Sequence, residues 1–370
     1  MISDNSPDES LCRGLRELVW ITRPYPLDRL FLSSHLTVFS FLCTSLSGQL
    51  PDEVFLNLAS VIAELQTSSL QSLRIRLPIA AEQTPTSLRS AVSSAVLRCG
   101  PSLTTLSVPT PLSDEAVKHL MQLPKLTTWE ARNGPPGVSD PSLSNAFLQL
   151  ETLELHVQES LEWLPLFEAA TRRISSGQDA RALSNRGPGQ KLTTLASRVQ
   201  VPIDAAFISP IKLFHGLVNL ALRPPCFGTG GCAFDLTDDD IAEIATALPN
   251  LVGVTFGGAC PANSCRTTVS SLLLFSTRCK NLRYLDIHFN TTNLLDDFRS
   301  MVEDPRPGNL CALPRCQLTQ LSVSHAPLRM EEESYGAVVA GFLSVFPLLH
   351  GIFGVAECWD RLNSKLCNEE

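Results

Sequence analysis

The sequence has no excess of basic residues. Its 370 residues include 29 Lys or Arg and 37 Asp or Glu, which gives a formal net charge of −8 at pH 7. Proteins that bind nucleic acid present a basic stripe or patch to the phosphate backbone. The acidic balance therefore argues against nucleic acid as a partner.

Signals for export or membrane insertion are also lacking. Residues 1–10 are polar and acidic, without the basic start and apolar run of a secretory signal. Residues 336–356 carry no formal charge over 21 residues, a length that could span a bilayer. This stretch contains Pro347, His350 and four glycines, which favours a buried helix followed by a strand. We expect a cytoplasmic or nuclear protein that does not bind a membrane.

The motifs that usually carry catalysis, phosphate binding or metal coordination are missing. No Gly-x-Ser-x-Gly nucleophile signature occurs, and the glycine-rich stretch 227–231 is not followed by Gly-Lys-Ser/Thr. The twelve cysteines are scattered, and none of their close pairs is followed within about 20 residues by the second close pair of Cys or His that is typical of zinc sites. Those pairs are Cys226 with Cys232, Cys260 with Cys265, and Cys311 with Cys316. The sequence predicts no enzyme, no cofactor and no metal; an enzyme would need a clustered nucleophile and base.

One leucine pattern, in contrast, is abundant. Its clearest copy is Leu282–Asn290: a leucine, two residues, a leucine, one residue, an apolar residue, two more residues and an asparagine. This pattern is typical of the strand of a leucine-rich repeat. Because side chains alternate along a strand, Leu285 and Ile287 should face a core, whereas Tyr284, Asp286 and His288 should face the opposite side.

The pattern recurs along the chain at a mean spacing of about 30 residues, near the upper end of the usual repeat length of about 20–29 residues. The second leucine position is occupied in successive copies by Leu18, Phe39, Leu73, Leu106, Trp129, Leu153, Leu195, Leu220, Val254, Leu285, Leu321 and Ile352. Two of these copies are doubtful, because Ser197 and Gly354 stand at their third apolar position.

Segments between the copies have helical signatures. The segment 237–248 starts with a capping residue and acidic side chains, and its apolar residues recur at helical spacing. Further helices are predicted at 52–65, 87–98, 113–120, 160–174, 267–279, 292–302 and 331–346. Several end in a Leu-Pro-x-Leu or Phe-Pro-Leu-Leu step, in which proline ends the helix before the next strand.

One helix per strand predicts an α/β fold: a leucine-rich-repeat solenoid, or horseshoe, with parallel strands on the concave face and helices on the convex face. Residues 15–356 should form about 11–12 irregular repeats. We expect a disordered N-terminus at 1–14 and a flexible, locally basic insertion at 175–191. Residues 357–370 should form a capping helix, because Trp359, Leu362 and Leu366 share one helical face.

The side chains between and after the strand leucines should line the concave face, here called the wall. Candidate partner-binding residues on it are Arg74, Arg76, Glu130, Arg132, Glu154, His156, Arg223, Tyr284, Asp286 and His288. Arginine and tyrosine often dominate binding energy at interfaces. Charges of both signs suit a protein surface better than a polyanion. The alternative is that some of these residues pair with one another and bind nothing.

Each histidine of the wall has an acidic neighbour on its own strand, Glu154 for His156 and Asp286 for His288. Such a pair can act in acid–base catalysis only in a pocket that also holds a substrate or nucleophile. The open wall of a solenoid rarely supplies one, so contact with a partner is the favoured role.

The repeats and their Leu-Pro-x-Leu steps resemble those of fungal F-box/leucine-rich-repeat proteins. The resemblance rests on Leu15–Trp20, Arg29–Leu36, Asn281–Ile287 and the ending Phe342–Pro347 with the Trp359 helix, and it covers nearly the whole chain. It implies a ribonuclease-inhibitor-like horseshoe. It also implies a substrate receptor of a cullin–RING (SCF-type) ubiquitin ligase, in which an F-box docks on the adaptor Skp1.

The first repeat copy begins by Leu15, so residues 1–14 are expected to hold no F-box. Either the sequence is truncated or the chain is a relative without an F-box, and binding of Skp1 and a cullin is expected only if an F-box-like element exists. The functional prediction is a monomeric, non-enzymatic protein-binding repeat protein that recognises substrates for ubiquitination. The alternative is an interaction scaffold without a link to a ubiquitin ligase.

Overall fold

The computed structural model describes most of the repeat region, in two compact units. The described residues are 14–22, 32, 35–43, 50–77, 84–108, 110–132, 149–157, 192–199, 203–209, 211–223, 234–257, 265–303, 316–323, 334–354 and 357–368. Unit 1 comprises Met1–His156 and Pro165–Lys191, and unit 2 comprises Val157–Leu164 and Leu192–Glu370. The predicted helix 160–174, the predicted insertion 175–191 and residues 1–13 lie outside the described residues.

In unit 1 the described residues form parallel strands that lie side by side in chain order. They are β1 (Glu17–Thr22), β2 (Val38–Cys43), β3 (Ser72–Arg76), β4 (Thr105–Val108), β5 (Thr128–Arg132) and β6 (Thr152–Val157). Their register joins equivalent positions of successive repeats. Leu18 pairs with Phe39, Phe39 with Leu73, and so on through Leu106 and Trp129 to Leu153.

Unit 2 follows the same rule. Its strands are β7 (Thr194–Val199), β8 (Asn219–Arg223), β9 (Gly253–Phe256), β10 (Tyr284–Ile287), β11 (Gln320–Ser322) and β12 (Gly351–Phe353). The register runs from Leu195 through Leu220, Val254, Leu285 and Leu321 to Ile352. The two doubtful copies thus form strands as well. Each copy of the leucine pattern coincides with a parallel strand, which confirms the predicted α/β solenoid.

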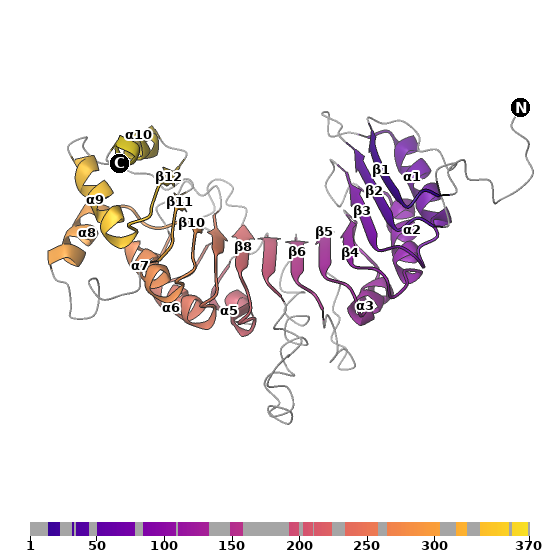
Figure 1. The fold of residues 1–370 in the computed structure, drawn as a ribbon, viewed down its shortest axis with the longest axis horizontal. Coiled ribbons are helices and arrows are strands. Elements are labelled where there is room, and N and C mark those ends of the chain that lie inside the picture. Colours follow the sequence, from indigo (N-terminus) through magenta and orange to yellow (C-terminus); the bar gives the residue numbers. More distant parts are fainter. Residues whose placement is uncertain are drawn as a thin grey trace, which may run out of the picture. The chain divides into compact units, whose positions relative to one another are not determined.

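Helices pack along one face of the strands in each unit (Figure 1). Unit 1 contains α1 (Asp52–Glu64), α2 (Thr86–Leu97) and α3 (Asp114–Gln122). Unit 2 contains α6 (Asp238–Ala247), α7 (Val269–Arg278), α8 (Leu294–Glu303), α9 (Tyr335–Val345) and α10 (Glu357–Asn368). Between β7 and β8 lie two short elements that the sequence did not predict, α5 (Ala205–Ile208) and the 3-10 helix η5 (Ile211–Leu213).

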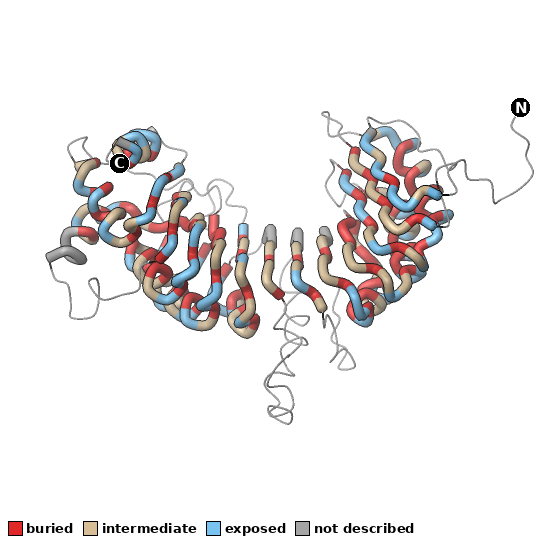
Figure 2. The backbone as a smooth tube through the Cα atoms, viewed as in Figure 1, coloured by how far each residue is buried: buried red, intermediate tan, exposed pale blue. Residues whose placement is uncertain are grey.

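The core of each unit lies between strands and helices. Buried and more exposed residues alternate along the strands (Figure 2), so that one strand face contributes Phe39, Leu73, Leu106 and Trp129, all buried, in unit 1. The helices contribute residues at helical spacing, such as Leu58 and Ile62 of α1. Burial of one such side chain is worth about 1.5–3 kcal/mol. The repeats are therefore held together by an unbroken apolar layer within each unit.

Neighbouring repeats are also joined at the entry to each strand. The carbonyl of the residue just before a strand accepts hydrogen bonds from two backbone N–H groups of the next repeat, as Arg16 does from Thr37 and Val38. At four strands the residue before the strand is a threonine whose hydroxyl donates to the same carbonyl at 2.9–3.1 Å. These threonines are Thr37, Thr104, Thr127 and Thr319. We call this set the threonine ladder.

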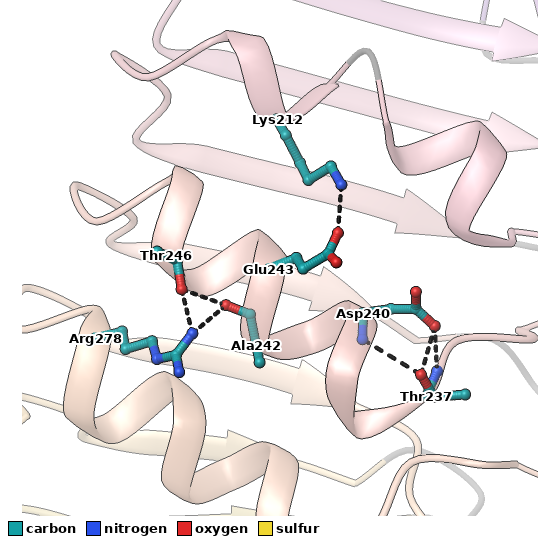
Figure 3. A network of polar contacts seen from close by, with 7 residues as sticks. All are labelled: Lys212, Thr237, Asp240, Ala242, Glu243, Thr246 and Arg278. Carbon is teal, nitrogen blue, oxygen red and sulfur yellow. Dashed lines mark hydrogen bonds and ion pairs between the residues drawn. The ribbon is translucent and has the colours of Figure 1, made fainter.

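Polar contacts connect successive helices in unit 2 (Figure 3). Lys212 of η5 forms an ion pair with Glu243 of α6 at 2.6 Å. The Arg278 guanidinium of α7 donates to the Ala242 carbonyl at 2.5 Å and to the Thr246 hydroxyl, both on α6. The helix α6 itself begins with a capping residue, as predicted: Thr237 forms a capping box with Asp240.

A further helix-to-helix contact is centred on Asp238 in the first turn of α6. Its carboxylate accepts hydrogen bonds from the Thr268 backbone N–H at 2.9 Å, the Thr268 hydroxyl at 2.7 Å and the Ser271 hydroxyl at 2.5 Å. Since Thr268 caps α7, this carboxylate fixes the start of the next helix.

The described part of the apolar stretch, residues 336–354, is a helix followed by a strand. Helix α9 ends at Val345, Pro347 follows, and β12 begins at Gly351. Within the described ranges, the chain has no helix of the length and apolar character that crossing a membrane requires. Helix α10 buries Trp359 and Leu362, and its Asn363 side chain accepts a hydrogen bond from the Ile352 N–H of β12 at 2.9 Å.

Candidate partner-binding wall

The wall is the strand face whose side chains alternate with the buried leucine positions. In unit 1 the residues that follow the second leucine position stand in register across six strands: Val19, Ser40, Arg74, Ser107, Glu130 and Glu154. Two positions further along each strand, Ile21, Leu42 and Arg76 are in register across β1, β2 and β3. Neighbouring strands lie about 4.8 Å apart, so these side chains form a continuous surface.

Arginine and glutamate side chains meet on this surface. Arg74 is exposed, and Arg76 approaches Glu130 with 3.6 Å between Nη2 and Oε2. The Arg76 side chain is 64% exposed and the Glu130 side chain 23% exposed. The Ser107 hydroxyl also donates to Glu130 Oε2 at 2.5 Å. An exposed ion pair of this kind contributes at most about 1 kcal/mol, so a partner can compete for either charge.

Beyond Glu17, the first strands of the wall in unit 1 are mostly apolar, a feature that the sequence reading missed. Val19 is 59% exposed and Ile21 65% exposed on β1, and Leu42 stands next to Ile21 on β2. The signal was present, because Val19 and Ile21 occupy the wall positions of the first repeat copy. Applying the alternation rule to that copy would have included them.

Arg132 and His156 lie at the ends of β5 and β6, where their backbones stand in register. The side chains of both residues are outside the described part of the structure. Glu154, two residues before His156, is partly exposed on β6. The backbone therefore brings these wall candidates to neighbouring positions, and their roles stay predictions.

In unit 2 the wall centres on Tyr284 and Asp286 of β10. Asp286 stands in register with Thr255 of β9 and Ser322 of β11. Burial, and then the negative charge of Asp286, raises the pKa of the Tyr284 phenol, while Arg223 and hydrogen bonds with Thr255 and Ser322 oppose the shift. The phenol is therefore a neutral hydroxyl at physiological pH, which can both donate and accept hydrogen bonds.

A glycine makes room for the Asp286 carboxylate. A Cβ atom added at Gly257 would collide with the carboxylate of Asp286, so any larger residue would displace it. Arg223 is exposed at the end of β8, where it stands in register with Arg198 of β7. Tyr284, Asp286 and Arg223 thus remain candidates on the wall of unit 2.

His288 was predicted to face the wall, and this prediction is wrong. Its exposed fraction is 1%, and it lies beyond the last residue of β10, Ile287. Ile287, His288 and Phe289 are all buried, because alternation ends where the strand ends. The Thr267 hydroxyl donates to the His288 carbonyl at 2.7 Å at this point. His288 is therefore not an exposed contact residue of the wall.

The buried thiols of unit 2 belong to the core. Cys316 Sγ lies 3.3 Å from the Leu282 carbonyl oxygen, and Cys279 Sγ lies 3.6 Å from that of Leu248. Burial raises the pKa of Cys279 to about 12, with a further contribution from Cys316, and raises the pKa of Cys316 to about 11. Both remain protonated near neutral pH and are poor nucleophiles. Among the described residues, no group of three or more His, Cys, Asp or Glu side chains could hold a metal ion.

No protein-family model matches the chain, and no curated protein matches it in sequence. Solved structures do match. A chain of the yeast Rad7–Elc1 complex is 12% identical with a TM-score of 0.43, over 90% of this chain and 79% of that one. A chain of the mouse RP105/MD-1 complex is 14% identical with a TM-score of 0.30, over 92% of this chain and 50% of that one. The fold assignment rests on the strand register and the buried leucine positions of this chain itself.

Proposed function

We propose that this chain is a non-enzymatic repeat protein that captures a protein partner on its wall. The observation that carries the proposal is the wall of unit 1. There, exposed charged and apolar side chains stand on strands that are fixed in register by the buried core behind them. Rigid strands hold contact residues in place before a partner arrives, which lowers the entropic cost of binding.

A finer proposal concerns the fate of the captured partner. The motifs Leu15–Trp20, Arg29–Leu36 and Asn281–Ile287 resemble those of F-box/leucine-rich-repeat proteins. On that basis the protein would recognise substrates for an SCF-type ubiquitin ligase and act in the cytoplasm or nucleus. The second candidate is an interaction scaffold without a link to the ligase; the mixed charges of the wall fit it equally well.

The test is affinity capture of the tagged full chain from cells of its source, with a proteasome inhibitor present, followed by mass spectrometry. Recovery of Skp1 and a cullin together with further proteins would support substrate recognition. Recovery of protein partners without these subunits would support the scaffold. Absence of any reproducible partner would contradict both.

A wall variant makes the experiment specific to this surface. Arg74→Glu combined with Asp286→Lys reverses one charge in each unit and leaves the net charge unchanged. The matched control is Lys125→Glu with Asp360→Lys, two exposed residues outside the wall. We expect the wall variant to lose at least about tenfold of the captured partner, which corresponds to about 1.4 kcal/mol, and the control to lose none. Equal capture by all three proteins would exclude the wall as the binding surface.

A further inference from the structure

The wall of unit 1 is divided into three chemically distinct zones. The apolar zone consists of Val19, Ile21 and Leu42 on β1 and β2. The basic zone consists of Arg74 and Arg76 on β3. The acidic zone consists of Glu130 and Glu154 on β5 and β6. Along the row of residues in register, the apolar zone is followed by the basic zone and then by the acidic zone. No other charged residue stands in this row, since Ser107 separates Arg74 from Glu130.

The zones contain three evenly spaced strands, β1, β3 and β5. Two strand intervals separate β1 from β3, and two more separate β3 from β5. At about 4.8 Å per interval, successive members of this set lie about 10 Å apart. This distance corresponds to about three residues of an extended chain or about seven residues along one helix face. A short segment of a partner can therefore contact all three zones at once.

The exposures show what such a segment must carry. Val19 and Ile21 are more than half exposed, and an apolar side chain of a partner would cover them favourably. Arg76 is 64% exposed and Arg74 is exposed, so both can receive a carboxylate. Glu130 and Glu154 are partly exposed, and a basic side chain would add to the positive charge that Arg76 already brings near Glu130.

We propose that the wall of unit 1 binds a partner segment in which an acidic residue lies between an apolar residue and a basic residue, at intervals of about 10 Å. The basic zone is the middle one, so the acidic residue is central in whichever direction the segment runs. This inference rests on the proposed function, because it names the chemistry of the partner at the same surface. Glu130 and Glu154 would repel a uniformly acidic segment, and Arg74 and Arg76 would repel a uniformly basic one.

The test is selection of random 16-residue peptides, displayed on phage, against the immobilised full chain. The proposal predicts enriched peptides with a central acidic residue, an apolar residue on one side and a basic residue on the other. The spacing should be about three residues, or about seven if the peptides are helical. Enriched peptides without this order, or no enrichment at all, would overturn the inference.

Three variants locate the binding. Arg74→Glu with Arg76→Glu should weaken an enriched synthetic peptide at least about tenfold, and Val19→Ser with Ile21→Ser should weaken it as well. Lys125→Glu with Lys280→Glu changes the net charge as much as the arginine variant does, yet both lysines lie outside the wall. This control should leave the affinity unchanged. A peptide that binds the arginine variant as tightly as the wild type contradicts the proposal. Arg74→Gln with Arg76→Gln replaces the arginine variant if charge reversal prevents folding.

The outcome can be separated from that of the proposed function. If Arg74→Glu with Asp286→Lys loses the captured partner but no peptide of the stated order is enriched, the wall binds a protein through other chemistry and only this inference fails. If peptides of the stated order bind but capture from cells does not depend on the wall, the proposed function fails instead.

Discussion

The two faces of the same strands follow different rules. On the core face, successive strands place an apolar residue at the second leucine position, from Leu18 to Leu153 in unit 1 and from Leu195 to Ile352 in unit 2. On the wall face, the residue that follows the second leucine position changes from valine to arginine to glutamate within a few strands. The core face determines the fold, whereas the wall can change its chemistry without changing the fold.

The strand β10 contains both faces within four residues. Leu285 and Ile287 are fully buried, whereas Tyr284 and Asp286, which alternate with them, are partly exposed. The Tyr284 phenol forms hydrogen bonds with Thr255 and Ser322, which stand in register with Asp286. This contrast gives a direct way to separate stability from binding by substitution.

The largest expected effect is on the core face. Leu285→Ala removes a fully buried side chain and should lower the free energy of unfolding by about 2–5 kcal/mol, because a cavity remains. Asp286→Ala on the same strand should cost much less. Chemical denaturation of both variants beside the wild type measures the difference. Equal losses in the free energy of unfolding would show that the core face contributes no more to stability than the wall face does.

A smaller effect is expected where one helix fixes the next. Asp238→Ala removes the acceptor of three hydrogen bonds from Thr268 and Ser271, which should cost about 1–3 kcal/mol. Asp239→Ala is the matched control, since Asp239 is exposed in the same helical turn. Thermal unfolding compares the two. If Asp239→Ala lowers the stability as much as Asp238→Ala does, the helix dipole alone accounts for the effect.

The threonine ladder should contribute about 1 kcal/mol at each hydroxyl. Thr104→Val keeps the shape of the side chain but removes the 2.9 Å hydrogen bond to the Gln71 carbonyl. Thr105→Val, at the first residue of β4, changes a wall hydroxyl that is not part of the ladder. Urea denaturation should show the larger loss for Thr104→Val, and the opposite order would contradict a stabilising role for the ladder.

Alkaline pH should weaken the core through its thiols. The folded-state pKa of Cys279 is raised from 9.0 to about 12, so its stabilising contribution is complete below pH 9 and is lost as the pH rises towards 12. Between pH 9 and 10 one such thiol should lower the free energy of unfolding by about 1 kcal/mol. Cys279→Ser should show a shallower decrease over this range in denaturation titrations. If the free energy of unfolding of Cys279→Ser falls with pH as steeply as that of the wild type, the pKa of the Cys279 thiol does not change on unfolding.

The sequence predicted the strands well because one strong period specifies them. Even Ser197 and Gly354, at positions that normally hold an apolar residue, did not prevent strand formation at β7 and β12, since backbone hydrogen bonds to a neighbouring strand suffice. The α5 and η5 elements were missed because they are too short to show a period. The threonine ladder was missed because its partners lie a whole repeat apart in sequence.

The wall was predicted less completely than the core. Alternation correctly assigns Arg74, Arg76 and Asp286 to positions between buried residues. It fails for His288, because sequence alone does not show where β10 ends. The apolar zone went unnoticed because valine and isoleucine are usually assigned to a core. Exposure, which decides between these roles, depends on the whole fold rather than on the local pattern.

The most direct test of binding at the wall is site-specific photo-crosslinking in cells. A photoreactive amino acid replaces Ser40, which stands in register with Arg74 on the wall, in one protein and Lys125, which is exposed outside the wall, in another. Capture of the partner on the wall predicts a covalent adduct with a partner protein from position 40 and none from position 125. No adduct from position 40, or the same adduct from both positions, would contradict it.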